Sequence, residues 1–342
     1  MRTVSESVIS EDNAQLRADV PRGLPMVVVL SGVSDAGGVV SQLGEYFDEH
    51  SSPREVIRFD TDVLLDYRAR RPIITFNKDH FEDYQPETLT LSLASDALGE
   101  PFLLLSGFEP DFRWERWVDT MLFLVDEFEV STTAWVHALP MPVPHTRDLR
   151  ATISGSREDL IEEHSIWQPT SRIAATAVHL LEYRLFGMGE SVAGITLLIP
   201  HYLAGNEYPA GLVGALDYLM AATGKLFSTE APREQAQKFR TRVDEQIGEN
   251  DESVSMVQNL EERYDQYVRD AEKDADLVSI DGEEVTGDDI DGLPTADQLA
   301  SELEQFLAGQ IPGPDDEPGE NWNLGHNPPE SPSGDGSPGD VQ

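Results

Sequence analysis

Four short runs of apolar residues stand out in the pattern of the chain, and each one ends in a turn rich in Gly, Pro, Ser or His. The runs and their turns occupy residues 26–38, 102–110, 134–147 and 194–202. Their strand-like parts are apolar at consecutive rather than alternate positions, which is typical of strands buried on both faces. Because a helix-like stretch follows each run, we predict an α/β domain with a mainly parallel sheet.

Apolar residues at helical spacing predict the helices of this domain. One apolar face recurs in each of four stretches, residues 39–47, 114–128, 173–187 and 209–224. Gly187 and Gly224 are the expected C-terminal caps, and Pro209 suits a first helical position. We also predict a strand at 55–59, a helical turn at 62–72, and strands of an antiparallel extension at 73–76 and 89–94.

The character of the chain changes beyond residue 228, where charged residues dominate and apolar ones become sparse. Residues 230–275 predict two amphipathic helices joined at 248–252, leaning on the core or on a neighbouring subunit. A capping box at 295–298 predicts one further short helix. We therefore divide the chain into a disordered segment 1–22, an α/β core domain 23–228, an acidic helical extension 229–310 and a disordered acidic tail 311–342.

Charge and composition narrow the classes of partner. The chain has 342 residues, of which 64 are acidic and 24 basic, giving a net charge of −40. Such a surface repels phosphate backbones and anionic lipids, so we expect no nucleic acid and no membrane partner. The alternative is that the charge only keeps the protein dispersed. With no cysteine, no membrane-length apolar run and no signal-peptide pattern, we expect a cytoplasmic protein.

The turns at the strand ends hold the candidate chemistry, because ligands of α/β sheets bind at the carboxyl ends of strands. In the first turn, the backbone N–H groups of Gly37 and Gly38 could hold an anion at a helix N-terminus. The alternative is a tight turn in which Asp35 caps the helix. The turn matches neither the dinucleotide fingerprint nor the phosphate loop.

The third turn is the most unusual, because three prolines at 140, 142 and 144 stiffen it directly before His145 and Arg147. His201 ends another strand and could converge with His145. Such a rigid loop can position a binding site. The alternative is a structural loop whose His and Arg pair with the acidic surface. The spacing demands no metal, and we expect neither metal nor cofactor.

At the end of the second run, Glu109 and Arg113 could form an ion pair that fixes the loop, or could contact a ligand. The chain contains no nucleophile elbow, zinc-helix motif or kinase-like set of motifs. We therefore assign no catalytic residue.

Several of these turns also carry a family resemblance. Its motifs are Gly32-Val-Ser-Asp-Ala-Gly37, Asp66-Tyr-Arg-Ala-Arg-Arg-Pro72, Leu105-Ser-Gly-Phe-Glu-Pro-Asp-Phe-Arg-Trp114, Leu139-Pro-Met-Pro-Val-Pro-His-Thr-Arg147, Leu181-Glu-Tyr-Arg184 and Ile199-Pro-His-Tyr-Leu-Ala204. Over about residues 24–225 the chain resembles the proteasome assembly chaperone 2 family, and its actinobacterial branch above all. The resemblance implies a three-layer α/β fold similar to nucleoside phosphorylases. It also implies a homo-oligomer, for which a trimer is one possible number, and a role in protein assembly without an established catalytic mechanism.

Two functional hypotheses follow. In the first, the chain is a non-catalytic assembly factor or adaptor that binds a protein partner, and a proteasome-related complex is one candidate partner. In the second, it is a small-ligand binder or a phosphorylase- or hydrolase-like enzyme that uses the strand-end residues Asp35, Glu109, Arg113, His145, Arg147 and His201. A histidine would then act as the general acid, since its pKa lies near working pH.

Overall fold

A computed structural model of the chain describes residues 8–32, 34–165, 170 and 172–281, and it describes side chains as far as residue 269. The chain divides into two units, Met1–Thr286 and Gly287–Gln342, and every described residue belongs to the first unit. The short helix predicted at the 295–298 capping box and the predicted tail 311–342 lie outside the described residues.

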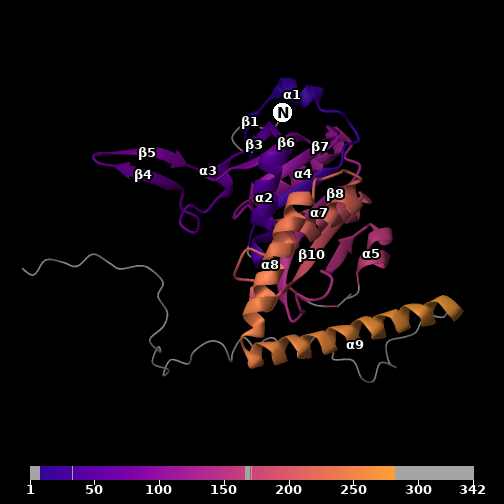
Figure 1. Ribbon diagram of the computed structural model, residues 1–342. Helices are drawn as coiled ribbons and strands as arrows, with labels where there is room; N and C mark the ends of the chain where they lie inside the picture. The colour runs from indigo at the N-terminus through magenta and orange to yellow at the C-terminus, as the bar shows by residue number, and fades with distance from the viewer. Residues whose placement is uncertain (1–7, 33, 166–169, 171, 282–342) are drawn as a thin grey trace, which may run out of the picture. The chain divides into compact units, whose positions relative to one another are not determined.

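The described part of the chain contains one eight-stranded sheet (Figure 1). In spatial order, its strands are β1 (Ile9–Asp12), β3 (Arg54–Phe59), β6 (Leu89–Ser95), β7 (Pro101–Phe108), β2 (Met26–Ser31), β8 (Thr133–Met141), β10 (Val192–Pro200) and β9 (Ala151–Gly155). The central strands β7, β2, β8 and β10 run parallel. They are the four apolar runs of the sequence.

The prediction of a mainly parallel sheet is wrong for the sheet as a whole, because its outer neighbours pair antiparallel. The turn at residues 96–100 shows why. It joins β6 to β7 in a few residues, and so short a connection can only join antiparallel strands. The Asp96 carboxylate holds this turn by accepting the backbone N–H groups of Leu98 and Glu100, each at 2.9 Å.

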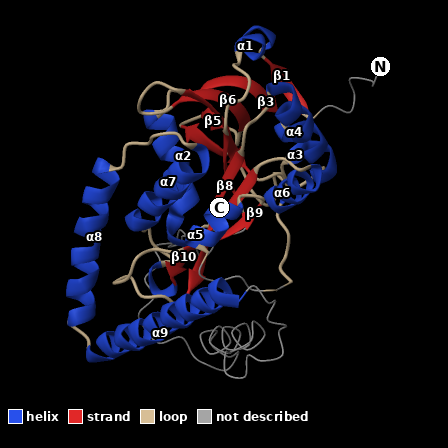
Figure 2. Ribbon diagram, turned by 90° about the vertical axis from the view of Figure 1, so that its right-hand side faces the viewer, coloured by secondary structure: helices blue, strands red, loops and turns tan. Residues whose placement is uncertain are grey.

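Helices cover both faces of the sheet, and an apolar cluster lies under each set (Figure 2). On one face, α2 (Val39–His50) packs against α7 (Pro209–Thr223), and on the other α4 (Trp114–Phe128) packs against α6 (Ala177–Met188). Alternate residues of β2 enter opposite clusters: Val27 belongs to one and Val28 to the other. This division explains why the central strands are apolar at successive positions.

The N-terminal segment is more ordered than we predicted. Residues 9–12 form the edge strand β1, which pairs with β3, and α1 (Ala14–Asp19) follows. The Asn13 side chain caps α1 by accepting the N–H of Leu16 at 3.1 Å, and Arg17 forms an ion pair with Glu127 of α4. The prediction of disorder is therefore wrong for residues 9–19, which are fixed by pairing and contacts that the local sequence does not show.

The long helices follow the predictions closely, with one shift. Helix α7 begins at Pro209 and ends before Gly224, whose φ of 69° suits a glycine cap. Helix α6, however, begins at Ala177 rather than 173 and is capped by Gly189 rather than Gly187. The start moves because the Thr176 side chain accepts the N–H of His179, which fixes the first turn.

Residues 61–85 contain a short helix and a separate hairpin. Helix α3 (Thr61–Leu64) is a single turn, so the predicted helical turn at 62–72 is helical only as far as Leu64. Strands β4 (Ile73–Asn77) and β5 (His80–Gln85) pair with each other and form a two-stranded sheet of their own. The predicted strands at 73–76 and 89–94 both exist, but the second is β6 and belongs to the main sheet.

The charged region after the core forms two helices, as predicted, α8 (Glu230–Gly248) and α9 (Asp251–Asp281). Helix α8 packs against α7 and buries Val243, while α9 buries Val257 and Leu260. The remaining helix, α5 (Glu158–His164), packs against β9. Among the described helices, none combines the length and the apolar character that crossing a membrane requires.

Candidate functional site

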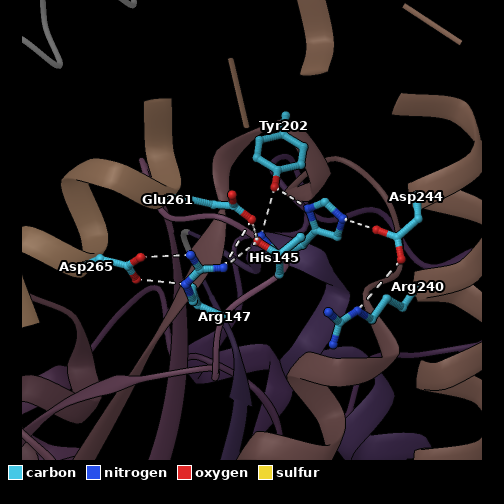
Figure 3. Close-up of polar contacts among 8 residues, drawn as sticks. His145, Arg147, Tyr202, Arg240, Asp244, Glu261 and Asp265 are labelled. Atoms are coloured by element: carbon cyan, nitrogen blue, oxygen red, sulfur yellow. Dashed lines mark hydrogen bonds and ion pairs between the residues drawn. The ribbon is translucent and has the colours of Figure 1, made fainter. Parts of the chain in front are cut away.

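The loop that follows β8 holds His145 in a buried network (Figure 3). The His145 side chain is only 3% exposed. Its backbone N–H donates to the Tyr202 hydroxyl at 2.9 Å, and its Nδ1 lies 2.6 Å from the same oxygen. On the other side of the ring, Nε2 lies 3.0 Å from Oδ1 of Asp244 in α8. One imidazole therefore joins the loop, the end of β10 and the helical extension.

The contacts of the imidazole favour one arrangement of protons. The Tyr202 oxygen already accepts the backbone N–H of His145, so its own proton can be donated to Nδ1. Nε2 then carries a hydrogen and donates it to Asp244. Burial raises the pKa of Tyr202 to about 12, so the phenol keeps its proton at neutral pH.

This order of hydroxyl, imidazole and carboxylate is also that of a catalytic triad. Here, however, the hydroxyl oxygen is a tyrosine oxygen that also accepts the backbone N–H of His145. The geometry instead suits a structural joint, in which each polar group has a fixed partner.

Arg147 makes the second connection to the helical extension (Figure 3). Its Nε and Nη2 donate to the two carboxylate oxygens of Asp265, each at 2.8 Å, and its Nη1 donates to Glu261 at 3.1 Å. The hydrogen bond to Asp265 is the main reason that the pKa of Arg147 is raised, and the same bond lowers the pKa of Asp265. A bidentate pair of this kind fixes orientation as well as distance.

His145 and Arg147 pair with acidic residues, as the structural alternative for the loop 140–147 predicts. The partners come from α8 and α9, at sequence separations of 99 to 118 residues. Thr146 adds a hydrogen bond to Glu261, and the Tyr264 hydroxyl donates to the backbone oxygen of Asp148 at 3.2 Å. We call the contacts of residues 145–148 with α8 and α9 the latch.

His201 approaches His145 only through the tyrosine beside it. The His201 and His145 rings each meet the Tyr202 ring edge-on, with ring centroids 5.3 and 5.7 Å away. Burial is the main reason that the pKa of His201 is lowered, so its neutral form is favoured. In the described part of the chain, no group of three or more His, Asp or Glu residues is arranged to hold a metal ion.

A cleft of about 570 Å³ lies beside the latch, between α7, α8 and residues 145–149. Its cationic lining consists of Arg147, Arg233 and Arg240, and its aromatic lining of Tyr208, Tyr218 and Phe239. Arg233 bonds to both oxygens of Asp217, whereas Arg240 lies 3.8 Å from Asp244 without a hydrogen bond. Of the three arginines in this cleft, Arg240 is therefore held least tightly.

In the turn after β2, the polar groups of Asp35, Gly37 and Gly38 form hydrogen bonds within the protein. The N–H of Gly37 donates to the Ala204 oxygen at 2.8 Å, and that of Gly38 to the Asp35 oxygen at 3.0 Å. Their φ angles of 72° and 58° lie in the left-handed region, which favours glycine. The Asp35 carboxylate accepts the N–H groups of Val40 and Ser41 at 2.7 and 3.0 Å, which caps α2. These bonds favour the tight turn over an anion cradle.

The expected ion pair between Glu109 and Arg113 is not formed. Glu109 is buried, and its carboxylate accepts the N–H of Ala177 at 2.6 Å, which ties the end of β7 to the start of α6. Burial is the main reason that the pKa of Glu109 is raised. Arg113 is exposed at the start of α4. Arg70 instead donates to the Glu109 backbone oxygen at 2.6 Å and pairs with Asp111 at 2.5 Å.

A second polar cluster, under α6, was missed by the sequence reasoning. Glu182 accepts the indole N–H of Trp135 at 2.6 Å, and burial raises the pKa of this carboxyl. Gly194 leaves the space for it, since an added Cβ would lie 2.4 Å from Oε2 of Glu182. His137 and His179 lie beside Trp135, and burial lowers the pKa of both. Gly194 was the signal available in the sequence, because a glycine inside an apolar strand often marks a place where another group approaches the backbone closely.

Together, the fold and the latch define an α/β protein with a parallel centre, whose strand-end loop anchors C-terminal helices. The chain belongs to the PAC2 family, whose sequence model matches residues 29–247. This confirms the family resemblance noted in the sequence. Among curated proteins, no match was found.

Solved structures of actinobacterial proteins are similar to the chain. A Mycobacterium tuberculosis protein of unknown function is 34% identical, with a TM-score of 0.67, covering 72% of this chain and 86% of that one. A Corynebacterium glutamicum protein of unknown function is 29% identical, with a TM-score of 0.68, covering 78% and 96%. A Mycobacterium tuberculosis homologue of a proteasome-assembly chaperone has the same fold at 19% identity, with a TM-score of 0.62, covering 68% and 100%.

Proposed function

We propose that this chain is a non-catalytic protein-assembly factor or adaptor, which acts in the cytoplasm as a homo-oligomer on a protein partner. A proteasome-related complex is the favoured partner. Membership of the PAC2 family supports this proposal, as does the fold shared with a protein described as a proteasome-assembly chaperone homologue.

The proposal rests on the observation that the side chains at the strand ends contact other parts of the protein. His145 and Arg147 hold α8 and α9, Asp35 caps α2, and Glu109 holds the start of α6. Groups with fixed structural partners suit a rigid scaffold that presents surfaces. An active site instead needs reactive groups that face a substrate.

The charge of the chain indicates what the partner surface is like. With a net charge of −40, the protein attracts basic surfaces and repels acidic ones. We therefore propose that the partner presents a basic or apolar surface to the acidic helical extension, and that association weakens as salt rises.

The test combines the purified full-length chain with purified proteasome α- and β-subunits from the same source. Native mass spectrometry at about 0.15 M salt, where the Debye length is about 8 Å, would follow the complexes formed. We expect a stoichiometric complex with unassembled subunits and a change in how fast complete rings appear. No complex, together with an unchanged rate of ring formation, would contradict the proposal.

The cleft beside the latch favours a second candidate function, a small-ligand binder of the phosphorylase-like kind. Its volume of about 570 Å³ falls within the range of small-molecule sites. Arg240 could contact an anion, and Tyr218 and Phe239 could contact a flat apolar group. The family resemblance implies a fold similar to that of nucleoside phosphorylases, and this fold would support the second candidate function.

Thermal-shift measurements with phosphate, adenosine and adenosine monophosphate test the second candidate. A ligand at about 100 times its dissociation constant stabilises the folded chain by about 2.7 kcal/mol, which gives a visible shift. The Arg240→Gln variant should lose that shift, whereas Lys238→Gln should keep it, because Lys238 pairs within α8 with Glu234 and does not line the cleft. No shift with any of the three compounds would contradict this candidate.

A further inference from the structure

The β4–β5 hairpin carries large apolar side chains that no other described part of the chain covers. Phe76 and Phe81 lie opposite each other on the two strands, with ring centroids 5.1 Å apart. They are 62% and 66% exposed. Ile74 and Tyr84 lie in the stretch where the register of the hairpin shifts, between the pairs Ile73–Gln85 and Thr75–Glu82, and both side chains are also exposed. We call Ile74, Phe76, Phe81 and Tyr84 the hairpin patch.

The surroundings of the hairpin do not explain these side chains. Every residue of β4 and β5 except Asn77 is exposed, and no other described element packs extensively on the two strands. In Figure 1 the hairpin stands out from the main sheet. A two-stranded hairpin is marginally stable in water by itself, and gathered exposed apolar side chains mark interaction sites. The hairpin patch therefore needs a covering surface.

Helix α6 has an outer face of the same kind. Tyr183 and Phe186, which are three residues apart on one side of the helix, are exposed, while Leu181 and Leu185 on the inner side are buried. A helix that is apolar on both sides is expected to be covered on both sides. We call Tyr183 and Phe186 the α6 patch. The hairpin patch and the α6 patch are both exposed within one chain, so they do not cover each other there.

Charge distinguishes these two surfaces from the rest of the molecule. Two copies of a chain with a net charge of −40 repel each other, so they can meet only where acidic charge is locally balanced. Residues 66–85 carry as many basic as acidic groups, namely Arg68, Arg70, Arg71 and Lys78 against Asp66, Asp79, Glu82 and Asp83. In α6, Arg184 balances Glu182. The three arginines that precede β4 therefore offset the net charge of −2 on residues 73–85, and the two charges of α6 cancel.

We propose that the hairpin patch of one copy docks on the α6 patch of a second copy. Because the two patches differ, the contact is heterologous, and repeating it closes a ring if the rotation allows. The aromatic rings of Phe76 and Phe81 would then lie against Tyr183 and Phe186, in the edge-on or offset arrangements that aromatic pairs prefer. The inference rests on the proposed homo-oligomer and names the surface that makes it.

The first test measures the mass of the full-length protein by light scattering over a range of concentrations. We expect the unsubstituted chain to be an oligomer, and both the Phe76→Ser/Phe81→Ser and the Phe186→Ser variants to have the mass of one chain. The control is Leu98→Ser, since Leu98 is 71% exposed but lies outside both patches. Circular dichroism confirms that each variant is folded. A monomeric unsubstituted chain, or an oligomer that survives both sets of substitutions, would overturn the inference.

The second test uses the fact that the chain has no cysteine, so that introduced thiols report only their own contacts. A Phe81→Cys chain is mixed with a Phe186→Cys chain under mild oxidation. We expect a disulfide-linked dimer in the mixture and little in either chain alone. A stronger cross-link in the Phe81→Cys chain alone would show hairpin-to-hairpin pairing and overturn the inference.

The two proposals can fail separately. If the proteasome subunits bind the chain but its mass does not depend on the hairpin, the docking inference fails and the adaptor proposal stands. If the mass depends on both patches but no partner binds, the docking inference stands and the adaptor proposal fails.

Discussion

Nε2 of His145 lies 3.0 Å from Oδ1 of Asp244, and this contact joins the loop after β8 to helix α8 across 99 residues of sequence. The imidazole is buried, whereas the Asp244 side chain is half exposed. The histidine therefore has few alternative partners, and its other nitrogen faces Tyr202. This ring is one of several contacts that place the helical extension on the core.

Replacing Tyr202 with Phe should destabilise the protein. The substitution leaves the backbone N–H of His145 and its Nδ1 without their oxygen partner in a buried place. A buried polar group that loses its partner costs about 1–3 kcal/mol, so the free energy of unfolding should fall by that amount. Urea unfolding measures it. Tyr67→Phe is the control, because the Tyr67 hydroxyl bonds to Asp62 at the exposed surface and its loss should change stability little.

Replacing Arg147 with Gln should loosen α9 while leaving the core almost unchanged. The variant loses the bidentate bond to Asp265, but the pair is partly exposed, and pairs of this kind contribute up to about 1 kcal/mol. Hydrogen exchange should therefore speed up in residues 251–265 and stay the same in β2 and β8. Lys238→Gln is the control and should leave both regions unchanged. Equal protection of α9 in the two variants would show that apolar contacts alone hold it.

Acidification should weaken the fold through the histidines under α6. Burial is the main reason that the pKa of His179 lies below its ordinary 6.5, and the charge of His137 adds to the effect. The folded state then binds fewer protons than the unfolded state below about pH 6.5, so the free energy of unfolding falls as the pH drops from there towards the folded pKa. Each unit of pKa difference contributes about 1.4 kcal/mol.

The His179→Gln variant tests this origin of the pH dependence. In the native chain, Nδ1 of His179 accepts the N–H of Thr176 at 3.0 Å, and a Gln oxygen can take that place without titrating. Urea unfolding between about pH 7.5 and pH 5.5 should then show a smaller loss of stability in the variant. Glu109 and Glu182, whose pKa values are raised, contribute with the opposite sign in both chains. An identical pH dependence in the two chains would rule out His179 as a source.

Adding one methyl group at Gly194 should disrupt the polar cluster under α6. The new Cβ would lie 2.4 Å from both Glu182 and Ser154 and 2.6 Å from Trp135, so the surrounding side chains must move. We expect Gly194→Ala to reduce the free energy of unfolding by about 1–3 kcal/mol and to change the fluorescence of Trp135. Gly44→Ala is the matched control, because no atom lies within 4 Å of its new Cβ in helix α2. That variant should gain up to about 1 kcal/mol.

The sequence determined the parts of this protein that depend on local pattern. The apolar runs identified the four central strands, because strands buried on both faces need apolar side chains at successive positions. Helical spacing located α4, α7, α8 and α9, and the Pro209 and Gly224 signals fixed both ends of α7. The ordered motifs at the turns identified the family, as the match over residues 29–247 confirms.

Only the tertiary structure decided which distant groups meet. The chain has 64 acidic residues, and nothing in the sequence singles out Asp244, Glu261 and Asp265 as the partners of residues 145–147. The pairing of β1 with β3 and the antiparallel edges of the sheet were hidden for the same reason. Periodicity reports how each segment is buried, whereas a contact between segments depends on the path of the whole chain. The sequence therefore identified the strand-end residues, but only the tertiary structure showed which partners their side chains contact.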